Sequence, residues 1–356
     1  MKIRTTIVVI SAAVVSIAGP GACDSGKPVE DGARIGSLPE TAEILFVSNR
    51  DTGKRRAEIY SMDREGRKVT RLTYTNEHHF IMGIDSSRCC IVASRAEEDT
   101  EMPPGLGNED KRSLWLLDLE TRREIRLTDP RNHAEGDSFS PDGEWIVFLM
   151  KLSGQEQSDI YRIRRDGSGL TRLTNTPAAI EGDPSWSNDG NDILFSYIDV
   201  STPRFVLKKM DTNGKNVQTV YDGGDGIEIP GVWEDGNYDP SWSPDDRWIV
   251  FERAVQYTEE NPENFGSGIW HIFKVKRDGT ELMDLSQAGG HQDGAEYLPS
   301  YSTDGRFIVF GSIFEAEDPK KSHCDIFKIN TVGGSLTRLT ENPASDMFPV
   351  WVPPRE

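Results

Sequence analysis

The chain has 356 residues, of which 36% are hydrophobic and 28% are charged, which is the composition of a soluble folded protein. Its formal net charge of −19 disfavours binding to nucleic acid or to an anionic lipid surface. The same charge favours cations, basic peptides or basic proteins as partners.

Residues 1–22 have the pattern of a secretory signal peptide. A short basic region is followed by the apolar run Ile7–Ala18, which is too short to cross a bilayer. The signal ends in Gly21-Ala22-Cys23, which resembles the bacterial lipoprotein cleavage box, although Pro20 stands where that box usually has Leu. This predicts lipidation of Cys23, the alternative being an ordinary cleaved signal. Residues 23–40 lack periodicity and predict a flexible tether.

One phrase recurs along the rest of the chain and is the strongest signal in the sequence. Each copy combines a Ser-aromatic-Ser run, a turn containing Asp, and an Ile-Val-Phe run, so it predicts two strands joined by a tight turn. The four clear copies are 138–148, 184–195, 240–251 and 299–310, and a degenerate copy runs from Met82 to Ala93.

Two further short phrases follow each copy. The first is Asp159-Ile-Tyr-Arg-Ile and its relatives, and the second is Thr171-Arg-Leu-Thr174 and its relatives. Turns such as Arg165-Asp-Gly167 separate the two, because glycine accepts a positive φ. Each unit is therefore a four-stranded antiparallel meander of about fifty residues, which is typical of a propeller blade.

The Ile-Val-Phe strand occurs six times, beginning at Ile44, Ile91, Ile146, Ile193, Ile249 and Ile308. The first unit lacks its own Ser-Trp-Ser strand, and 348–352 at the other end of the chain supplies the missing pattern. The sequence therefore predicts an all-β fold, a six-bladed propeller over residues 41–356 in which strand 348–352 closes the ring in the first blade. Such closure removes an open sheet edge.

These phrases resemble the WD-like propeller repeat of TolB, the periplasmic component of the Tol-Pal system, over residues 41–353. The same repeat occurs in the propellers of prolyl oligopeptidases and tricorn proteases and in oligogalacturonate lyases. The nucleophile elbow Gly-x-Ser-x-Gly of the peptidases is absent from this sequence. The repeat specifies the architecture, whereas function resides in loops on that architecture.

In a meander blade, the segments after the second and fourth strands share one face of the disc, which we call the long-loop face. The longest irregular segments fall on this face, and such a concentration favours a binding role over tolerated insertion. They are Glu97–Arg112, Asp222–Asn237, Val255–Gly268, Ser286–Glu296 and Phe314–His323.

Six polar residues, one per blade, stand just before the innermost strands and predict a ring at the channel mouth. They are His79, Glu135, Glu181, Asn237, Glu296 and Asp346. Four are acidic, so Glu135, Glu181, Glu296 and Asp346 are candidates to hold Ca²⁺ through oxygen ligands or to accept a basic peptide end. The alternative is a solvated acidic rim.

Histidines suggest a second, enzymatic possibility. His78, His79, His133 and His291 lie in equivalent blade-connecting segments and are candidate ligands of a transition metal. Oligogalacturonate lyases, which the repeat resembles, use histidines with a divalent metal in such a place. The resemblance thus implies an alternative function as a metal-dependent polysaccharide lyase or hydrolase.

Two other sets of residues recur with the repeat and are interpreted as structural. The turn aspartates Asp142, Asp189, Asp245 and Asp304 are expected to form turns rather than act as acids or bases. The tryptophans Trp145, Trp186, Trp242, Trp248 and Trp351 are expected to pack between neighbouring blades.

Together these patterns predict a non-enzymatic, monomeric scaffold of the cell envelope. We expect it to be exported as a periplasmic or outer-membrane-associated lipoprotein, attached to the membrane only through its lipid. Its expected partner is a protein or basic peptide, bound through the long-loop face and the channel mouth.

Overall fold

A computed structural model describes residues 35–52, 56–75, 77–96, 112–155, 157–199, 202–223, 237–257, 268–291, 295–314 and 323–354. The predicted signal peptide and Cys23 lie outside these residues. So does most of four of the five long segments, whereas of Ser286–Glu296 only residues 292–294 lie outside the described part. None of the helices in the described part has the length and apolar character needed to span a membrane.

The described strands form six four-stranded antiparallel units, two of which are joined into one eight-stranded sheet by a parallel bridge between Trp270 and Ala295. Blade 1 contains β24 (Asp346–Trp351), β1 (Ile44–Ser48), β2 (Glu58–Met62) and β3 (Thr70–Arg71). Blade 2 contains β4 (His79–Ile84), β5 (Cys90–Ala96), β6 (Arg112–Asp118) and β7 (Arg123–Arg126). Blade 3 contains β8 (His133–Phe139), β9 (Trp145–Lys151), β10 (Asp159–Arg164) and β11 (Thr171–Arg172).

The second half of the ring repeats this plan. Blade 4 contains β12 (Ala179–Trp186), β13 (Asp192–Asp199), β14 (Thr202–Asp211) and β15 (Gln218–Tyr221). Blade 5 contains β16 (Asn237–Trp242), β17 (Trp248–Tyr257), β18 (Gly268–Lys276) and β19 (Met283–Asp284), followed by the short helix α1 (Leu285–Gly289). Blade 6 contains β20 (Ala295–Tyr301), β21 (Phe307–Phe314), β22 (His323–Asn330) and β23 (Thr337–Arg338).

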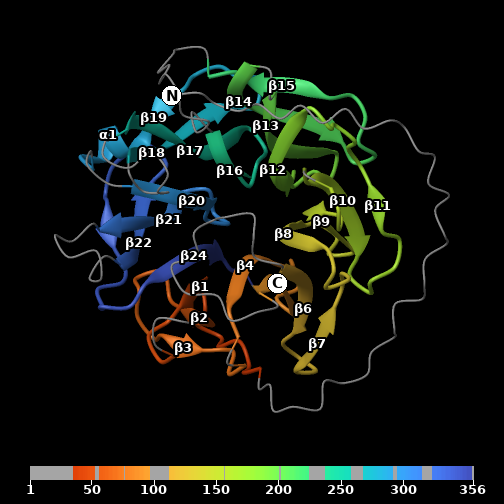
Figure 1. The fold of residues 1–356 in the computed structure, drawn as a ribbon. Helices are drawn as coiled ribbons and strands as arrows, with labels where there is room; N and C mark the ends of the chain where they lie inside the picture. Colours follow the sequence, from red (N-terminus) through yellow and green to blue (C-terminus); the bar gives the residue numbers. More distant parts are fainter. Residues whose placement is uncertain are drawn as a thin grey trace, which may run out of the picture.

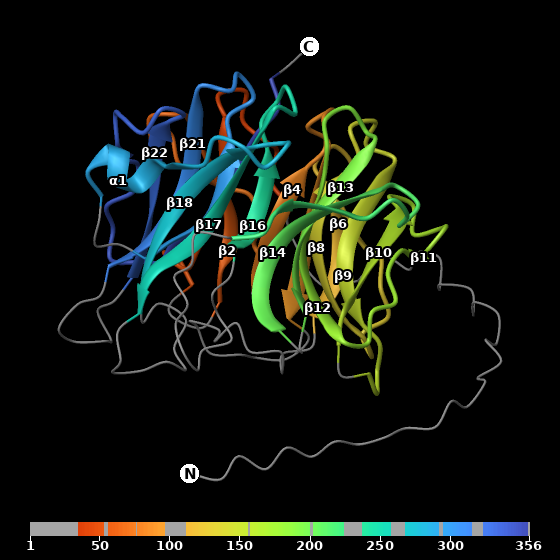
Figure 2. The ribbon, with the colours of Figure 1, turned by 90° about the horizontal axis from the view of Figure 1, so that it is seen from above.

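The blades stand around a central axis, with β24, β4, β8, β12, β16 and β20 innermost (Figure 1). Seen from the side, the strands run between the two faces of a thick disc (Figure 2). The outermost strands of blades 1, 3, 5 and 6 have two residues each, which leaves little exposed sheet edge.

The predicted ring closure is confirmed. Strand β24 pairs antiparallel with β1, with Ile44 opposite Trp351 and Ser48 opposite Asp346. Trp351 is 5% exposed and shares a hydrophobic cluster with Phe46. The observed strand begins two residues earlier than predicted and ends one residue earlier. The two ends of the propeller therefore meet within one blade.

The core lies between the blades and is built from the Ile-Val-Phe strands. Residues 44–47 of β1 are fully buried, as are the matching residues 146–148 of β9. Neighbouring blades cover both faces of each second strand, so both sets of side chains are apolar and the alternation seen in a half-exposed strand is lost.

The predicted tether is too long at its C-terminal end. Ile35 is 3% exposed and pairs with Thr73, and the amide of Gly36 donates to the carbonyl of Leu72 at 2.6 Å. Leu38 packs on the same apolar cluster as Ile35. Two apolar residues three positions apart were too weak a pattern to predict this attachment.

Candidate functional site

The predicted channel-mouth residues share one structural position in five of the six blades. Each lies opposite the equivalent position of the second strand in its own blade. The pairs are His79 with Arg95, Glu181 with Tyr197, Asn237 with Arg253, Glu296 with Ser312 and Asp346 with Ser48. In blade 3 this position belongs to Ala134, and Glu135 follows it. The repeat lacks one residue there, since Asp137-Ser138 replaces Asp183-Pro184-Ser185, and a shift of one residue moves a side chain to the other face.

These side chains are buried within the blades rather than gathered around the channel. His79, Glu296 and Asp346 are 0% exposed, and Glu181 is 3% exposed. None of them is among the described residues that line the central cavity. Of Asn237, the structure describes the backbone only.

Each of the buried carboxylates is held by partners from the protein. Thr174 and Thr176 donate hydroxyl hydrogen bonds to Glu181, the latter at 2.7 Å. Glu296 accepts from the Ser286 hydroxyl and bonds the ring of His291. Arg50 donates to both oxygens of Asp346 at 2.9 and 2.8 Å.

A hydroxyl following the fourth strand completes this network in five blades. Each accepts a hydrogen bond of 2.8–2.9 Å from an amide of the third strand: Thr73 from Ile59, Thr128 from Leu114, Thr174 from Ile160, Ser286 from Ile272 and Thr340 from Ile326. The arginine of the Thr-Arg-Leu-Thr phrase bonds an acid of the third strand, as in Arg71 with Glu58 at 3.0 Å and Arg172 with Asp159 at 2.5 Å. Of the predicted ring residues, Glu181 and Glu296 bond this hydroxyl and thus belong to a repeated structural network.

Glu135 differs from the others because it is partly exposed and lies beside Arg112 and His133, at 2.5 and 3.1 Å. Burial raises the pKa of Glu135, but the hydrogen bond from His133 and the charge of Arg112 outweigh it and leave this pKa below its ordinary value. Glu135 is therefore a paired carboxylate.

The histidines predicted as metal ligands are distributed over blade segments with separate partners. His78 is buried against Phe80, with ring centroids 4.5 Å apart, and Nε2 of His79 lies 2.6 Å from the hydroxyl of Thr75. Burial, with the charges of Arg95 and His78, lowers the pKa of His79 well below its ordinary value. In the described part of the chain, no three His, Cys, Asp or Glu residues are grouped to hold a metal ion. The calcium and transition-metal sites stay predictions.

A cavity of about 330 Å³ occupies the centre of the ring and is lined by the inner strands of all six blades. It extends from the middle of these strands to the turns that follow them, including Asn188 and Pro353. Those turns belong to the face opposite the long-loop face. The described cavity therefore opens at the end of the channel where the sequence had placed only tight turns.

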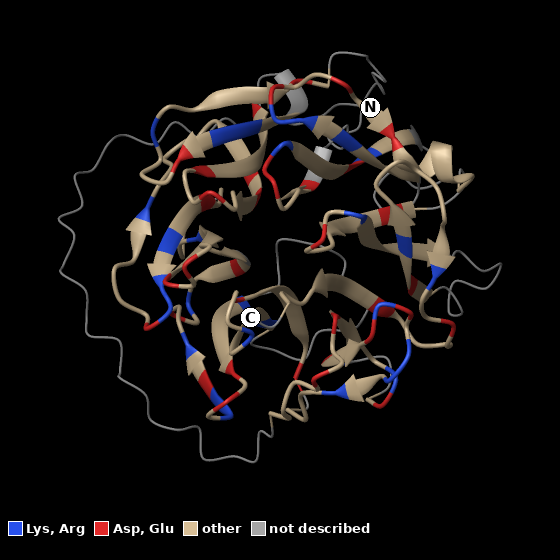
Figure 3. Ribbon diagram, turned by 180° about the vertical axis from the view of Figure 1, so that it is seen from behind, with Lys and Arg blue, Asp and Glu red and all other residues tan. Residues whose placement is uncertain are grey.

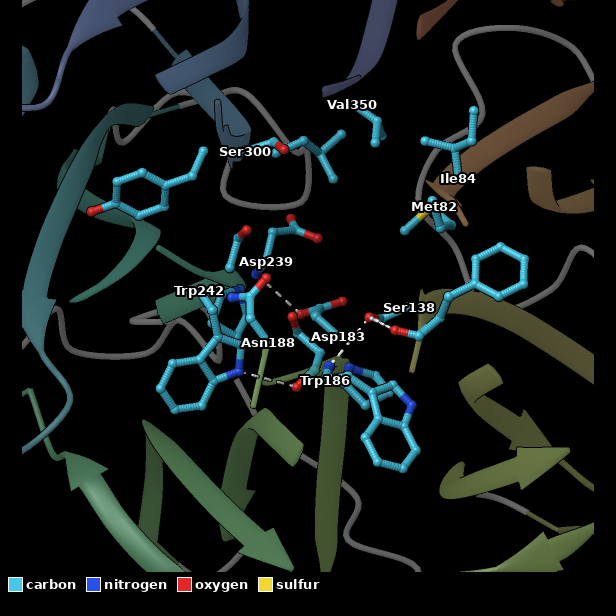
Figure 4. Close-up of a pocket in the computed structure, with 18 of the residues that line it drawn as sticks. Met82, Ile84, Ser138, Asp183, Trp186, Asn188, Asp239, Trp242, Ser300 and Val350 are labelled. Atoms are coloured by element: carbon cyan, nitrogen blue, oxygen red, sulfur yellow. Dashed lines mark hydrogen bonds between the residues drawn. The ribbon is translucent and has the colours of Figure 1, made fainter. Parts of the chain in front are cut away.

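The wall of this cavity has two chemically different sides (Figure 4). Strands β12 and β16 contribute Asp183 and Asp239 and the hydroxyl residues Ser185 and Ser241. The opposite side is largely apolar, with Met82, Ile84, Leu298, Phe348 and Val350, and it also includes Ser300. A ligand of this cavity meets carboxylates on one side and mainly hydrocarbon on the other.

Bulges in the inner strands position these residues. Asp183, Asp239, Leu298 and Phe348 occupy equivalent places in the last four inner strands, with φ between 49° and 56°. Aspartate tolerates this left-handed conformation better than most residues. Asp183 and Asp239 were not predicted from the sequence as channel residues. The signal that marks them is the Asp-Pro step before the Ser-Trp-Ser run in blades 4 and 5.

Asp183 and Asp239 sit beside a third carboxyl group, that of Glu252. One oxygen of Asp183 accepts from the Ser196 hydroxyl at 3.0 Å and from the Asp239 amide at 3.3 Å. Glu252, which is 1% exposed, accepts from the Leu298 amide at 2.6 Å. These bonds link the inner strands of blades 4, 5 and 6.

The carboxyl groups of this cluster hold their protons more tightly than free carboxyls do. Burial, with a smaller effect of Glu135, raises the pKa of Asp183 to about 6. Burial, assisted by the charge of Asp183, raises the pKa of Glu252 well above its ordinary value. Perturbed carboxyls beside a cavity are a recurrent feature of functional sites.

The turn aspartates are confirmed as turn formers. Each accepts a hydrogen bond from the serine two residues before it, at 2.5–2.7 Å: Asp142 from Ser140, Asp189 from Ser187, Asp245 from Ser243 and Asp304 from Ser302. The interblade role of the tryptophans is also borne out, since the indoles of Trp242 and Trp351 donate to carbonyls of the preceding blades, Ser185 and Ser300, at 3.2 and 3.1 Å.

Ring, meander blades and closing strand define the class of this protein, which is a β-propeller. A family model described as the TolB beta propeller domain matches residues 107–261. This segment, which is less than half of the chain, thus resembles a TolB-like propeller.

Solved structures agree with this assignment. TolB from Acinetobacter baumannii has a TM-score of 0.64 at 15% identity, over 89% of this chain and 68% of its own. A putative TolB from Agrobacterium tumefaciens gives 0.57 at 16% identity, over 91% and 100%. An oligogalacturonate lyase from Vibrio parahaemolyticus gives 0.50 at 13% identity, over 87% and 79%. At these identities the likeness shows the fold alone.

Two curated relatives match part of the sequence. An uncharacterized protein of Agrobacterium fabrum, Atu1656, is 34% identical over 148 residues, which are 39% of this chain and 46% of the relative. An uncharacterized peptidase of Bacillus subtilis, YuxL, is 25% identical over 241 residues, which are 67% of this chain and 30% of the relative. The chain therefore spans less than half of the length of either relative.

Proposed function

We propose that this protein is an exported scaffold of the cell envelope, anchored by a lipid on Cys23, that binds a protein or peptide partner through its long-loop face and central channel. The observation that carries the channel part of this proposal is the central cavity, which opens on the face opposite the long-loop face; the role of the long-loop face stays a prediction from the sequence. Inner strands from all six blades line the cavity, and its charged lining residues in the described structure are Asp183 and Asp239.

Charge favours a basic partner. The chain has a net charge of −19, and Lys and Arg lie mostly on the outer strands of the blades (Figure 3). A cationic peptide is therefore drawn toward the acidic channel rather than repelled from it. The TolB-like fold supports a binding role in general, while the identity of the partner depends on residues specific to this chain.

Crosslinking in living cells tests the proposal. The full-length chain with a C-terminal tag is crosslinked in its own envelope, and the partner recovered with it is identified. We expect Asp183→Lys to abolish recovery, because a cation then lines the cavity. Glu144→Lys is the matched control, since Glu144 is exposed on the same face and does not line the cavity.

Equal recovery with both variants, or no partner above an untagged background, would overturn the proposal. The lipid anchor is tested separately. Cys23→Ser should release the mature protein into the soluble envelope fraction, whereas the parent chain should stay with the membrane. Release of both proteins would exclude the anchor.

The alternative function is a metal-dependent polysaccharide lyase or hydrolase. Acidic oligosaccharides carry carboxylates, and Asp183 and Asp239 disfavour their entry into the cavity. His133 and His291 also bond Glu135 and Glu296 of their own segments. Metal content of the purified protein, followed by turnover of acidic oligosaccharides, separates this alternative from the scaffold.

A further inference from the structure

The described lining of the central cavity holds two acidic side chains, Asp183 and Asp239. This described lining contains no Lys, Arg or His. Some buried carboxylates elsewhere in the fold are paired with arginine, as in Asp346 with Arg50 and Asp159 with Arg172, whereas Glu181 is held by hydroxyl groups. Within the described residues, Asp183 forms no ion pair of this kind, and its partners are a hydroxyl and an amide.

The opposite wall restricts the kind of cation that fits. Met82, Phe348 and Val350 offer hydrocarbon only, and Phe348 is fixed by an edge-to-face contact with Phe80 at 5.4 Å. A hard divalent ion needs six or more oxygen ligands, which a half-apolar wall does not supply. A cation that is itself half hydrocarbon matches both sides.

We infer that the cavity binds a protonated aliphatic amine. The ammonium group lies beside Asp183 and Asp239, and the hydrocarbon chain lies against Met82, Phe348 and Val350. An ammonium group has three hydrogen-bond donors, and the hydroxyls of Ser185 and Ser241 add acceptors on the acidic side of the wall.

The size of the cavity agrees with such a ligand. At about 330 Å³ it lies at the lower end of the range for small-molecule pockets, which suits an alkylamine or one lysine side chain. The two sources of this chemistry are a free amine and a lysine of a bound peptide. In the second case, the inference names the group that the proposed partner inserts into the channel and rests on that proposed function.

Calorimetric titration of the full-length purified protein tests the inference. The probes are n-butylamine, ethylamine, 1-butanol and calcium chloride, each at constant ionic strength. We expect n-butylamine to bind about sixteenfold more tightly than ethylamine, because it has two more methylenes and each buried methylene contributes roughly a factor of four. We expect 1-butanol and calcium to bind at least tenfold more weakly than n-butylamine.

Two variants test whether the amine binds beside Asp183 and Asp239. Asp183→Asn and Asp239→Asn should each weaken n-butylamine binding at least tenfold, whereas Glu144→Gln removes the same charge outside the cavity and should leave it unchanged. Circular dichroism and thermal melting establish that each variant is folded. The inference fails if n-butylamine does not bind, if both asparagine variants bind it as the parent does, or if calcium binds more tightly than the amine.

A peptide probe, acetyl-Leu-Lys-Leu-amide, distinguishes the two sources. Tighter binding of the peptide than of n-butylamine assigns the site to a lysine of a macromolecular partner, and weaker binding assigns it to a free amine. Both outcomes support an amine site. Because these titrations use small probes and no partner, their failure leaves the crosslinking result standing, and the reverse also holds.

Discussion

Asp246 and Asn188 replace two residues of the repeat and bond each other across the interface of blades 4 and 5. Asp246 takes the place of the turn glycine, with φ of 54°, and Asn188 takes the place of the turn proline. The Asp246 carboxylate accepts from the amide and the side chain of Asn188, both at 2.8 Å, and from the Asp189 amide at 2.7 Å. Each departure from the repeat is thus compensated by the other.

Asp246→Gly should destabilise the protein even though it restores the repeat. Glycine relieves a left-handed conformation worth about 1 kcal/mol, but three donors of Asn188 and Asp189 lose a charged acceptor worth about 1.5–3 kcal/mol for each bond. Even at the lower end of that range, urea unfolding should show a net loss of about 3.5 kcal/mol. Asp246→Asn keeps one acceptor oxygen and should lose less stability. An Asp246→Gly variant as stable as the parent would contradict the idea that Asp246 and Asn188 compensate for each other.

Thr174→Val should destabilise the interface between blades 3 and 4. The Thr174 hydroxyl accepts from the Ile160 amide at 2.9 Å and donates to the buried Glu181 carboxylate, so valine leaves both groups without this partner. The expected loss is about 2–4 kcal/mol, measured by urea unfolding. Thr174→Ser retains the hydroxyl and should recover most of it; equal losses in both variants would show that the methyl group, rather than the hydroxyl, matters.

The fold could be predicted because its signals are local and repeated. The Ile-Val-Phe runs, the turn aspartates and the tryptophans each specify one strand or turn, and six copies make the pattern unmistakable. Even the closure could be predicted, because Trp351 follows a proline by two residues, as Trp186 and Trp242 do.

The site could not be predicted in the same way because it depends on register and tertiary contacts. The bulge at Asp183 changes which side chains reach the channel, and a bulge is set by backbone conformation rather than by residue type. Glu181 resembles a channel residue in sequence, yet Thr174 and Thr176, on the preceding segment, hold it inside the blade. Glu252 follows an Ile-Val-Phe run that otherwise reads as core.

Trp351→Ala should weaken the closure of the ring. The Trp351 side chain is 5% exposed, packs with Ile44 and Phe46, and donates to the carbonyl of Ser300. Its removal leaves a cavity between the first and last blades and should cost about 3–5 kcal/mol in urea unfolding. Trp145→Ala is the control, since Trp145 is only half-buried and should cost less; the reverse order would argue against closure by β24.

The raised pKa of Asp183 predicts how stability changes with pH. An unfolded aspartate has a pKa near 3.9, whereas burial, with a smaller contribution from the charge of Glu135, raises the folded pKa of Asp183 to about 6. Between these values the folded protein binds a proton that the unfolded chain releases, so the contribution of Asp183 to stability falls as the pH rises from about 4 to about 6. Above pH 6 the loss is complete, at most about 3 kcal/mol.

Asp183→Asn removes this titration, so urea unfolding from pH 4 to pH 7 should show the variant gaining stability relative to the parent as the pH rises. Asp142→Asn should show no such trend between pH 4 and pH 7, because the hydrogen bond from Ser140 lowers the pKa of Asp142, and the stability from its carboxylate is fully present above pH 4 and lost only in stronger acid. A stability difference between parent and Asp183→Asn that stays constant with pH would mean that Asp183 titrates as an ordinary carboxyl. The carboxyl cluster at the cavity wall would then be as well hydrated as the surface turns.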